Sequence, residues 1–365
     1  MKTSRIWRHL LLLVVAVALV LGGCGEATPT PAQKAEEAAG STGQEAPVAE
    51  EESEGGQKEA DAAGSGGVMT IAYNDDLATL DPAIGYDWTN WPAIKMVFDA
   101  LLDYDETTNL VPRLAAEMPE ISDDATQYTF TLREGVTFHN GRELEASDVE
   151  YSMTRVLDPE TKSPGAGFYT NILGAKEFID GDADSVEGIE VLDDYTIQFT
   201  LTEPDVTFLN KVALNFAFVV PKEEVEEWGE EFGHHPVGTG PFVFKSWTPG
   251  QQLEFGKYED YFIEGMPGLD GVIIQVGVAP DVQILRLERG EIDMMGDPIP
   301  APDYVRIKQD PAWEDRLVTA PQASTVYIAI NTRMEPFDDV RVRQALNYAI
   351  NKDRVVKLLN GRVRP

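Results

Sequence analysis

Cysteine and basic residues are scarce in this chain of 365 residues. Cys24 is the only cysteine, so an intramolecular disulfide and a cluster of thiolate metal ligands are both excluded. Lys and Arg number 29 against 63 Asp and Glu, which gives a net charge of −34. Such a charge repels phosphate groups. We therefore expect neither a nucleic acid nor an anionic membrane surface, bound through basic patches, as a partner.

Catalytic and metal-binding motifs are also missing. The chain has no GxSxG, HExxH or GxxxxGK[ST] string, the spacings that place a nucleophile, a zinc pair or a phosphate loop. His234 and His235 are adjacent and would point in opposite directions on an extended chain, which favours a loop over a metal site. Residues 180–184 resemble the start of a calcium loop, but Ser185 and Val191 replace its glycine and glutamate. We predict no catalytic residue, metal or cofactor.

Long hydrophobic runs are limited to one segment near the N-terminus. Residues 10–21 are uninterrupted apolar residues that follow three basic ones. The run is too short to span a bilayer but fits the hydrophobic region of a signal peptide. It ends at Gly22-Gly23-Cys24, which resembles a bacterial lipobox. We expect residues 1–23 to be a lipoprotein signal peptide and Cys24 to carry lipid. The alternative is an ordinary signal peptide with a chance cysteine.

The next segment lacks the residues that build a core. Residues 25–67 contain 10 acidic residues, two lysines, no aromatic residue and a single large aliphatic one, Val48. Such a composition cannot bury enough apolar surface to offset the entropy lost on ordering. We expect residues 24–67 to be an acidic, disordered tether.

Beyond residue 68 the pattern mixes strands and helices and predicts an α/β fold. Tyr128–Leu132 and Ile197–Leu201 alternate apolar and polar residues, as half-buried strands do. Ser147 and Glu150 have the spacing of a capping box and predict a helix. Gly238-Thr239-Gly240 lacks the third glycine of a dinucleotide fingerprint and indicates a backbone turn. Further helices are expected over residues 281–288, 338–350 and 352–359.

Longer strings resemble a known family. They include FDALLDYDETTNLVPRLAAEMP from Phe98, HPVGTGPFVFKSW from His235 and NTRMEPFDDVRVRQALNYAINKDRVV from Asn331. They follow one another in the family's order across residues 70–357. The chain is similar to bacterial extracellular solute-binding proteins of family 5, the peptide- and nickel-binding receptors of ABC importers.

The resemblance implies a two-lobe, periplasmic-binding-protein-like fold with an extra subdomain in lobe I. The chain stops at Pro365, where relatives continue, so we expect the second lobe to be incomplete in either a truncated record or a fragment. The expected divisions are lobe I at 68–110 and 188–277, the extra subdomain at 111–187, and the start of lobe II at 278–365.

The resemblance also implies a function. A small peptide or similar polar solute would be captured by hinge closure and delivered to permease and ATPase subunits, with no covalent chemistry. We expect a monomer on the outer face of the cytoplasmic membrane, held there only by lipid on Cys24. Peptide is the default ligand; an oligosaccharide, a nickel chelate and haem stay open. A receptor for a membrane sensor and a secreted hydrolase are the alternative classes.

The expected ligand contacts are mostly aromatic. Those at residues 86–91 lie in the loop after Leu80-Asp81-Pro82. The pairs at residues 168–169 and 261–262 lie in segments that approach the cleft in relatives. For each ring the alternative is core packing. The candidates are Tyr86, Asp87, Trp88, Trp91, Phe168, Tyr169, Tyr261 and Phe262.

Overall fold

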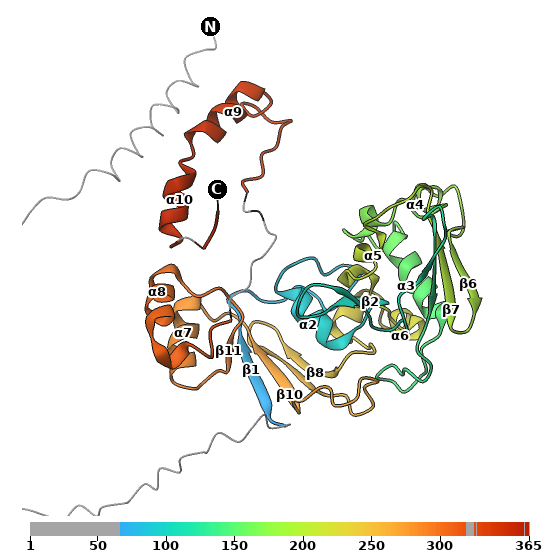
Figure 1. The fold of residues 1–365 in the computed structure, drawn as a ribbon, viewed down its shortest axis with the longest axis horizontal. Coiled ribbons are helices and arrows are strands. Elements are labelled where there is room, and N and C mark those ends of the chain that lie inside the picture. Colours follow the sequence, from blue (N-terminus) through green and yellow to red (C-terminus); the bar gives the residue numbers. More distant parts are fainter. Residues whose placement is uncertain (1–65, 319–324, 326, 361, 365) are drawn as a thin grey trace, which may run out of the picture. The chain divides into compact units, whose positions relative to one another are not determined.

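The structure, a computed structural model, describes residues 66–364 apart from 319–324, 326 and 361. The predicted signal peptide, Cys24 and nearly all of the predicted tether lie outside the described residues. Strands and helices alternate along the described chain, as expected for an α/β protein (Figure 1). Among the described helices, none has the length and apolar character needed to cross a membrane.

The first sheet has five strands in the order β11-β1-β10-β9-β8. β1 (Val68–Ala72) runs parallel to β10 (Gly271–Gln275) and to β11 (Met294–Met295). β9 (Gln252–Lys257) pairs antiparallel with β10 and with β8 (Phe242–Thr248). The sheet therefore joins segments from the start of the described chain with segments about 200 residues later.

Helix α2 (Asn90–Val97) packs on this sheet and shares its core. Its Ile94 and Val97, and Phe98 just after it, are fully buried, because their spacing places them on one face of the helix. The sheet contributes buried side chains that alternate along its strands, as the period of two requires: Ile71, Leu253, Phe255, Val272 and Ile274.

The second sheet has four antiparallel strands in the order β4-β5-β7-β6. They are β4 (Glu120–Ile121), β5 (Gln127–Thr131), β7 (Thr196–Thr200) and β6 (Ile189–Asp193). The two strands predicted from alternation are confirmed and pair with each other, with Phe130 opposite Ile197. This sheet continues past residue 187, where the extra subdomain was expected to end.

Helix α3 (Ala146–Leu157) packs against β6 and β7. Its predicted start is wrong by two residues, because the N-cap is Glu145 rather than Ser147. The Asp148 carboxylate accepts from the Glu145 amide at 2.9 Å, and the Glu145 side chain accepts from the Asp148 amide. Arg142 holds Asp148 with two further bonds of 2.7 and 2.9 Å. One face of the helix is apolar and buried: Val149, Met153, Val156 and Leu157.

The remaining regular elements are short. A hairpin joins β2 (Leu102–Tyr104) to β3 (Leu110–Pro112). α4 (Ala175–Asp180) lies between α3 and β6 in the chain, and α5 (Phe208–Lys211) and α6 (Lys222–Trp228) follow β7. Short 3-10 turns cover Ala166–Phe168, Asn215–Ala217, Gly229–His234 and Pro311–Trp313.

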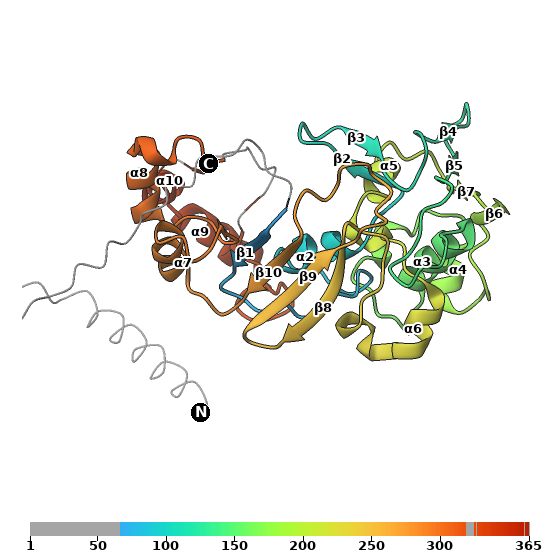
Figure 2. The same cartoon turned by 90° about the horizontal axis from the view of Figure 1, so that it is seen from below.

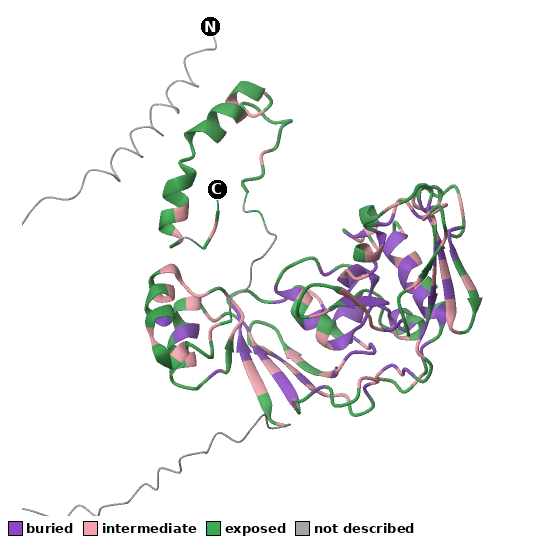
Figure 3. Ribbon diagram, in the orientation of Figure 1, coloured by how far each residue is buried: buried purple, intermediate pink, exposed green. Residues whose placement is uncertain are grey.

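The helices predicted near the C-terminal end are confirmed. They are α7 (Pro280–Glu288), α9 (Val340–Ala349) and α10 (Lys352–Leu358), with α8 (Ala301–Gln309) in addition. α7 and α8 lie side by side in both views, and Arg306 pairs with Glu288 across them (Figures 1 and 2). Neither α9 nor α10 buries a side chain among the described residues, whereas β10 and α3 each bury more than half of their residues (Figure 3).

Candidate functional site

The loop after Leu80-Asp81-Pro82 is built around one carboxylate and one glycine. The Asp81 side chain accepts from the Ala83 amide at 3.0 Å, and its backbone carbonyl accepts from the Gly85 amide at 2.8 Å. A Cβ on Gly85 would lie 2.5 Å from Cδ1 of Ile94 in α2, so the Ile94 side chain would have to shift to admit a side chain there. The Trp91 indole donates to the Gly85 carbonyl at 3.0 Å and closes the loop.

This loop and the 3-10 turn at Ala166–Phe168 bring three of the predicted residues together around Phe216. The ring centroids of Tyr86, Phe168 and Trp91 lie 5.4, 6.0 and 6.2 Å from that of Phe216. Phe216 is 1% exposed, whereas Tyr86 and Phe168 are 55% and 37% exposed. We call these four residues the aromatic shelf. It presents two open rings that are fixed to a buried one.

Trp88 contacts a different ring from the one that Tyr86 contacts, although only one residue separates the two in the sequence. Its ring meets Tyr73 edge to face at 6.0 Å and is 53% exposed. Burial, with a smaller contribution from the charge of Asp297, raises the pKa of Tyr73. Asp87 is exposed, and its backbone carbonyl accepts amides at the start of α2. Trp88 and Asp87 are therefore open to a ligand without being part of the aromatic shelf.

Tyr169 lies in the core. It is 0% exposed, its hydroxyl donates to the Lys211 carbonyl at 2.9 Å, and burial raises its pKa well above the usual range. Its neighbour Phe168 belongs to the aromatic shelf and is partly exposed. Tyr169 thus has no exposed surface to offer a ligand in this structure.

Tyr261 and Phe262 lie in a separate polar network. The Tyr261 hydroxyl donates to Asp99 at 3.2 Å, Thr239 donates to the same carboxylate at 3.1 Å, and the Arg113 Nε lies 3.6 Å away. Burial raises the pKa of Asp99 to about 6, against the opposing effect of Arg113. Tyr261 is nearly buried, and its ring packs on the partly buried Phe262 at 4.7 Å.

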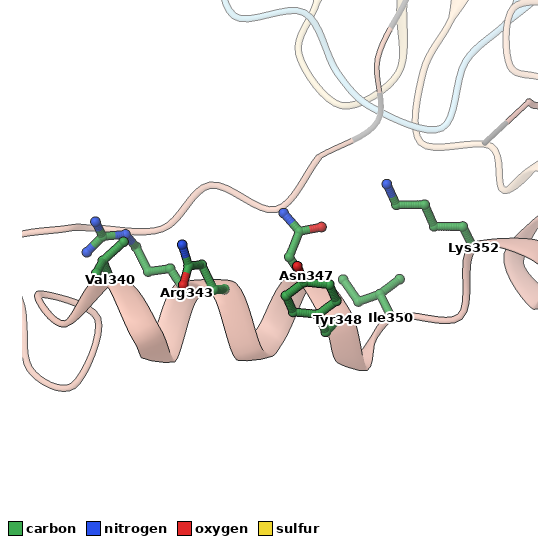
Figure 4. A pocket seen from close by; sticks show the side chains of 7 residues that line it. Val340, Arg343, Asn347, Tyr348, Ile350 and Lys352 are labelled. Carbon is green, nitrogen blue, oxygen red and sulfur yellow. The ribbon is translucent and has the colours of Figure 1, made fainter.

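A surface hollow of about 600 Å³ lies along α9 and its junction with α10 (Figure 4). None of the predicted site residues lines it, and Tyr348, which does, is 90% exposed. The lining side chains are Val340, Arg343, Gln344, Asn347, Tyr348, Ile350 and Lys352.

Within the described part of the chain, no group of three His, Cys, Asp or Glu side chains is placed to hold a metal ion.

Phe216 was missed by sequence reasoning. It belongs to the apolar run Phe216–Val220, which has the pattern of a core segment, and its neighbours in that run are indeed buried. No local signal separates a ring beneath an exposed shelf from a ring in the middle of a core.

Solved structures of the same architecture place this fold among periplasmic peptide-binding proteins. The Escherichia coli murein tripeptide binding protein MppA matches with a TM-score of 0.74 and 29% identity, over 80% of this chain and 57% of that one. Helicobacter pylori DppA in complex with the peptide STSA matches with a TM-score of 0.70 and 29% identity, over 82% and 59%.

Residues 109–365 match the family described as bacterial extracellular solute-binding proteins, family 5 Middle, and the chain belongs to this family. The glutathione-binding protein GsiB of Salmonella paratyphi A is 30% identical over 80% of this chain and 53% of its own length. Di/tripeptide-binding protein 2 of Pseudomonas aeruginosa is 33% identical over 70% and 48%. The chain spans about half the length of the curated relatives that it matches.

Proposed function

We propose that this protein is the solute-binding component of an ABC importer, which captures a small peptide and passes it unchanged to permease and ATPase subunits. Family membership supports a solute-binding role, and the relatives include proteins named for glutathione and for di- and tripeptides. The observation that carries the proposal is the aromatic shelf. Tyr86 and Phe168 are exposed although Phe216 and the Asp81 turn fix their positions.

The shelf suits a ligand with an apolar side chain. Fixed aromatic rings offer a large contact area with little loss of side-chain entropy, and a peptide side chain can stack on them. The exposed Trp88 and Asp87 continue the same loop and would meet the polar parts of the solute. Tyr261 and Phe262 are proposed to support the site through the Asp99 network, because little of Tyr261 is open to a ligand.

Replacing a shelf ring should weaken peptide binding. We expect Tyr86→Ala and Phe168→Ala each to cost about 1–2 kcal/mol of binding free energy, through lost apolar contact and stacking. Isothermal titration with short peptides measures the loss. Trp228→Ala is the matched control, because Trp228 is as exposed as Phe168 at 37% but stacks on His235 outside the shelf.

Two outcomes would count against this reading of the site. If the shelf variants lost stability yet bound every peptide as tightly as the parent, the rings would serve the core alone. If mass spectrometry found the peptide cleaved after incubation, the secreted-hydrolase alternative would replace the receptor.

We also propose a lipid anchor on Cys24 that holds the protein on the outer face of the cytoplasmic membrane. The apolar run of residues 10–21 ends there, and this is the only cysteine of the chain. Intact-mass spectrometry of membrane-extracted protein should find a diacylated Cys24 as the mature N-terminus. Cys24→Ser should leave the protein unlipidated. A mature chain that begins at any other residue would refute the anchor.

A further inference from the structure

Two of the shelf residues, Tyr86 and Trp91, lie in a loop that is held by an ion pair with a residue far away in the sequence. Arg155, near the end of α3, donates from Nη1 and Nη2 to the two oxygens of Asp81, at 2.8 and 2.5 Å. The Arg155 side chain is 11% exposed and that of Asp81 is 4% exposed. Two parallel bonds between planar groups fix orientation as well as distance. We call residues 81–91 the ligand loop.

Further contacts from the same part of the chain reach the ligand loop or the ring beneath it. The Ser163 hydroxyl donates to the Ala83 carbonyl, and Ala83 is 3% exposed. Phe168 packs on Phe216, and a Cβ on Gly165 would lie 2.3 Å from the Phe216 ring, so the backbone there lies directly against it. These contacts all come from residues 155–168, inside the segment 111–187 predicted as an extra subdomain.

The ligand loop has little regular structure of its own. Between Asp81 and Trp88 it contains turns and bends and no strand or helix, and Tyr86 and Trp88 project from it exposed. A mobile loop would have to be ordered on binding, and that entropy loss would reduce affinity. Fixing the loop beforehand removes this cost.

We propose that residues 111–187 brace the ligand loop in its binding conformation, with Arg155 and Ser163 as the positioning residues. Arg155 acts through Asp81, which in turn accepts hydrogen bonds from the Ala83 and Gly85 amides and so fixes their positions. Ser163 acts through the Ala83 carbonyl. The inference rests on the proposed function in one respect, namely that the ligand loop contacts the solute. The bracing itself is independent of ligand identity.

Amide hydrogen exchange of the whole protein tests the brace without a ligand. Arg155→Lys keeps the charge but cannot form two parallel bonds. The Ala83 and Gly85 amides should then exchange at least about 10-fold faster, because local opening becomes easier. Arg142→Lys is the matched control: Arg142 makes the same paired bonds, to Asp148 of the same helix, and its remaining side-chain bonds go to Glu143 and Glu223 rather than to the loop. It should change those two amides by less than about two-fold.

Ser163 supplies a second and milder test. Ser163→Ala should also speed exchange at the Ala83–Gly85 turn, and Ser163→Thr, which retains the hydroxyl, should restore the parent rate. This pair decides the matter if Arg155→Lys does not fold. Unchanged exchange in both Arg155→Lys and Ser163→Ala, or an equal increase in Arg142→Lys, would overturn the brace.

Binding of the tripeptide Ala-Phe-Ala tests the functional consequence. Arg155→Lys should bind it about 10-fold more weakly than the parent, as expected when a preorganised loop must be ordered on binding. Faster loop exchange with unchanged affinity would overturn the link to binding. If the parent binds no peptide, the proposed function fails while the exchange experiment still decides whether the brace exists.

Discussion

Asp99→Asn and His139→Gln should change the pH dependence of stability in opposite directions. The two groups flank one backbone turn. Asp99 accepts from Thr239 at 3.1 Å, and the His139 ring is hydrogen-bonded at 2.9 Å to the carbonyl of Gly240, the next residue. Burial is the main cause of the pKa shift of both groups. It raises the pKa of Asp99, which is an acid, and lowers that of His139, which is a base.

Asp99 favours the folded state at low pH. Burial raises the pKa of its carboxyl from 3.8 to about 6, against the charge of Arg113 and the bonds from Thr239 and Tyr261; the charge of Asp103 adds to the rise. Between those pH values the folded state holds more protons than the unfolded chain. The contribution of Asp99 to stability is therefore fully present below pH 3.8 and is lost as the pH rises through about 6.

His139 has the opposite effect over the same range. Burial, with a smaller contribution from Lys245, lowers its pKa from 6.5 to about 4, although its bond to Gly240 works in the other direction. Here the unfolded chain holds more protons. The contribution of His139 is present above pH 6.5 and is lost as the pH falls through about 4.

Urea unfolding at pH 5, 6 and 7 separates the two contributions. On going from pH 7 to 5, Asp99→Asn should lose about 2 kcal/mol of unfolding free energy, because only the histidine effect remains. His139→Gln should gain about 1 kcal/mol over the same range. The range stops at pH 5 because a chain with 63 acidic residues loses net charge and solubility below it.

An exposed carboxylate provides the control for this experiment. The pKa of Asp124 is lowered by bonds from Ser122 and Thr126, so it titrates below the chosen range in both states. Asp124→Asn should leave the pH profile of the parent unchanged. Profiles of Asp99→Asn and His139→Gln that run parallel to the parent would show that neither group is perturbed as the structure indicates.

The strands and helices of this protein follow from local sequence to a large extent. The alternation at Tyr128–Leu132 and Ile197–Leu201 identified two strands that pair, because a half-buried strand must place every second residue inward. The start of α3 could not be read in the same way. Ser147 has a good capping side chain, but Arg142 holds Asp148 in place and moves the cap to Glu145. Tertiary contacts decide such boundaries.

The site was only partly readable from sequence for a related reason. Phe168 and Tyr169 are adjacent and equally aromatic, yet one is 37% exposed on the shelf and the other is fully buried. Arg155 and Asp81 are 74 residues apart, and nothing in either local pattern indicates that they meet. A loop without periodicity gives no face to predict, so exposure there depends on contacts that only the folded chain reveals.

The turn Gly238-Thr239-Gly240, which is hydrogen-bonded to Asp99 and His139, should lose much stability when a single methyl group is added to either glycine. A Cβ on Gly238 would lie 2.2 Å from the Val97 carbonyl oxygen, and one on Gly240 would lie 2.5 Å from the Val97 carbonyl carbon. Neither glycine has a positive φ, so close approach rather than backbone conformation requires it. The predicted turn is thus a contact surface for the end of α2.

Gly238→Ala and Gly240→Ala should each lower the free energy of unfolding by about 3 kcal/mol, since the obstructing atoms are backbone and cannot rotate away. The end of α2 also cannot retreat without breaking the bond from the Gly240 amide to the Val97 carbonyl at 2.8 Å. Urea unfolding at pH 7 measures the loss. Gly268→Ala is the control, because its Cβ meets nothing within 4 Å and its φ is not positive. It should be neutral or stabilise by up to about 1 kcal/mol. If Gly240→Ala unfolded at the same urea concentration as Gly268→Ala, the turn and α2 would be free to move apart, and the tight packing that buries Asp99 would not exist in solution.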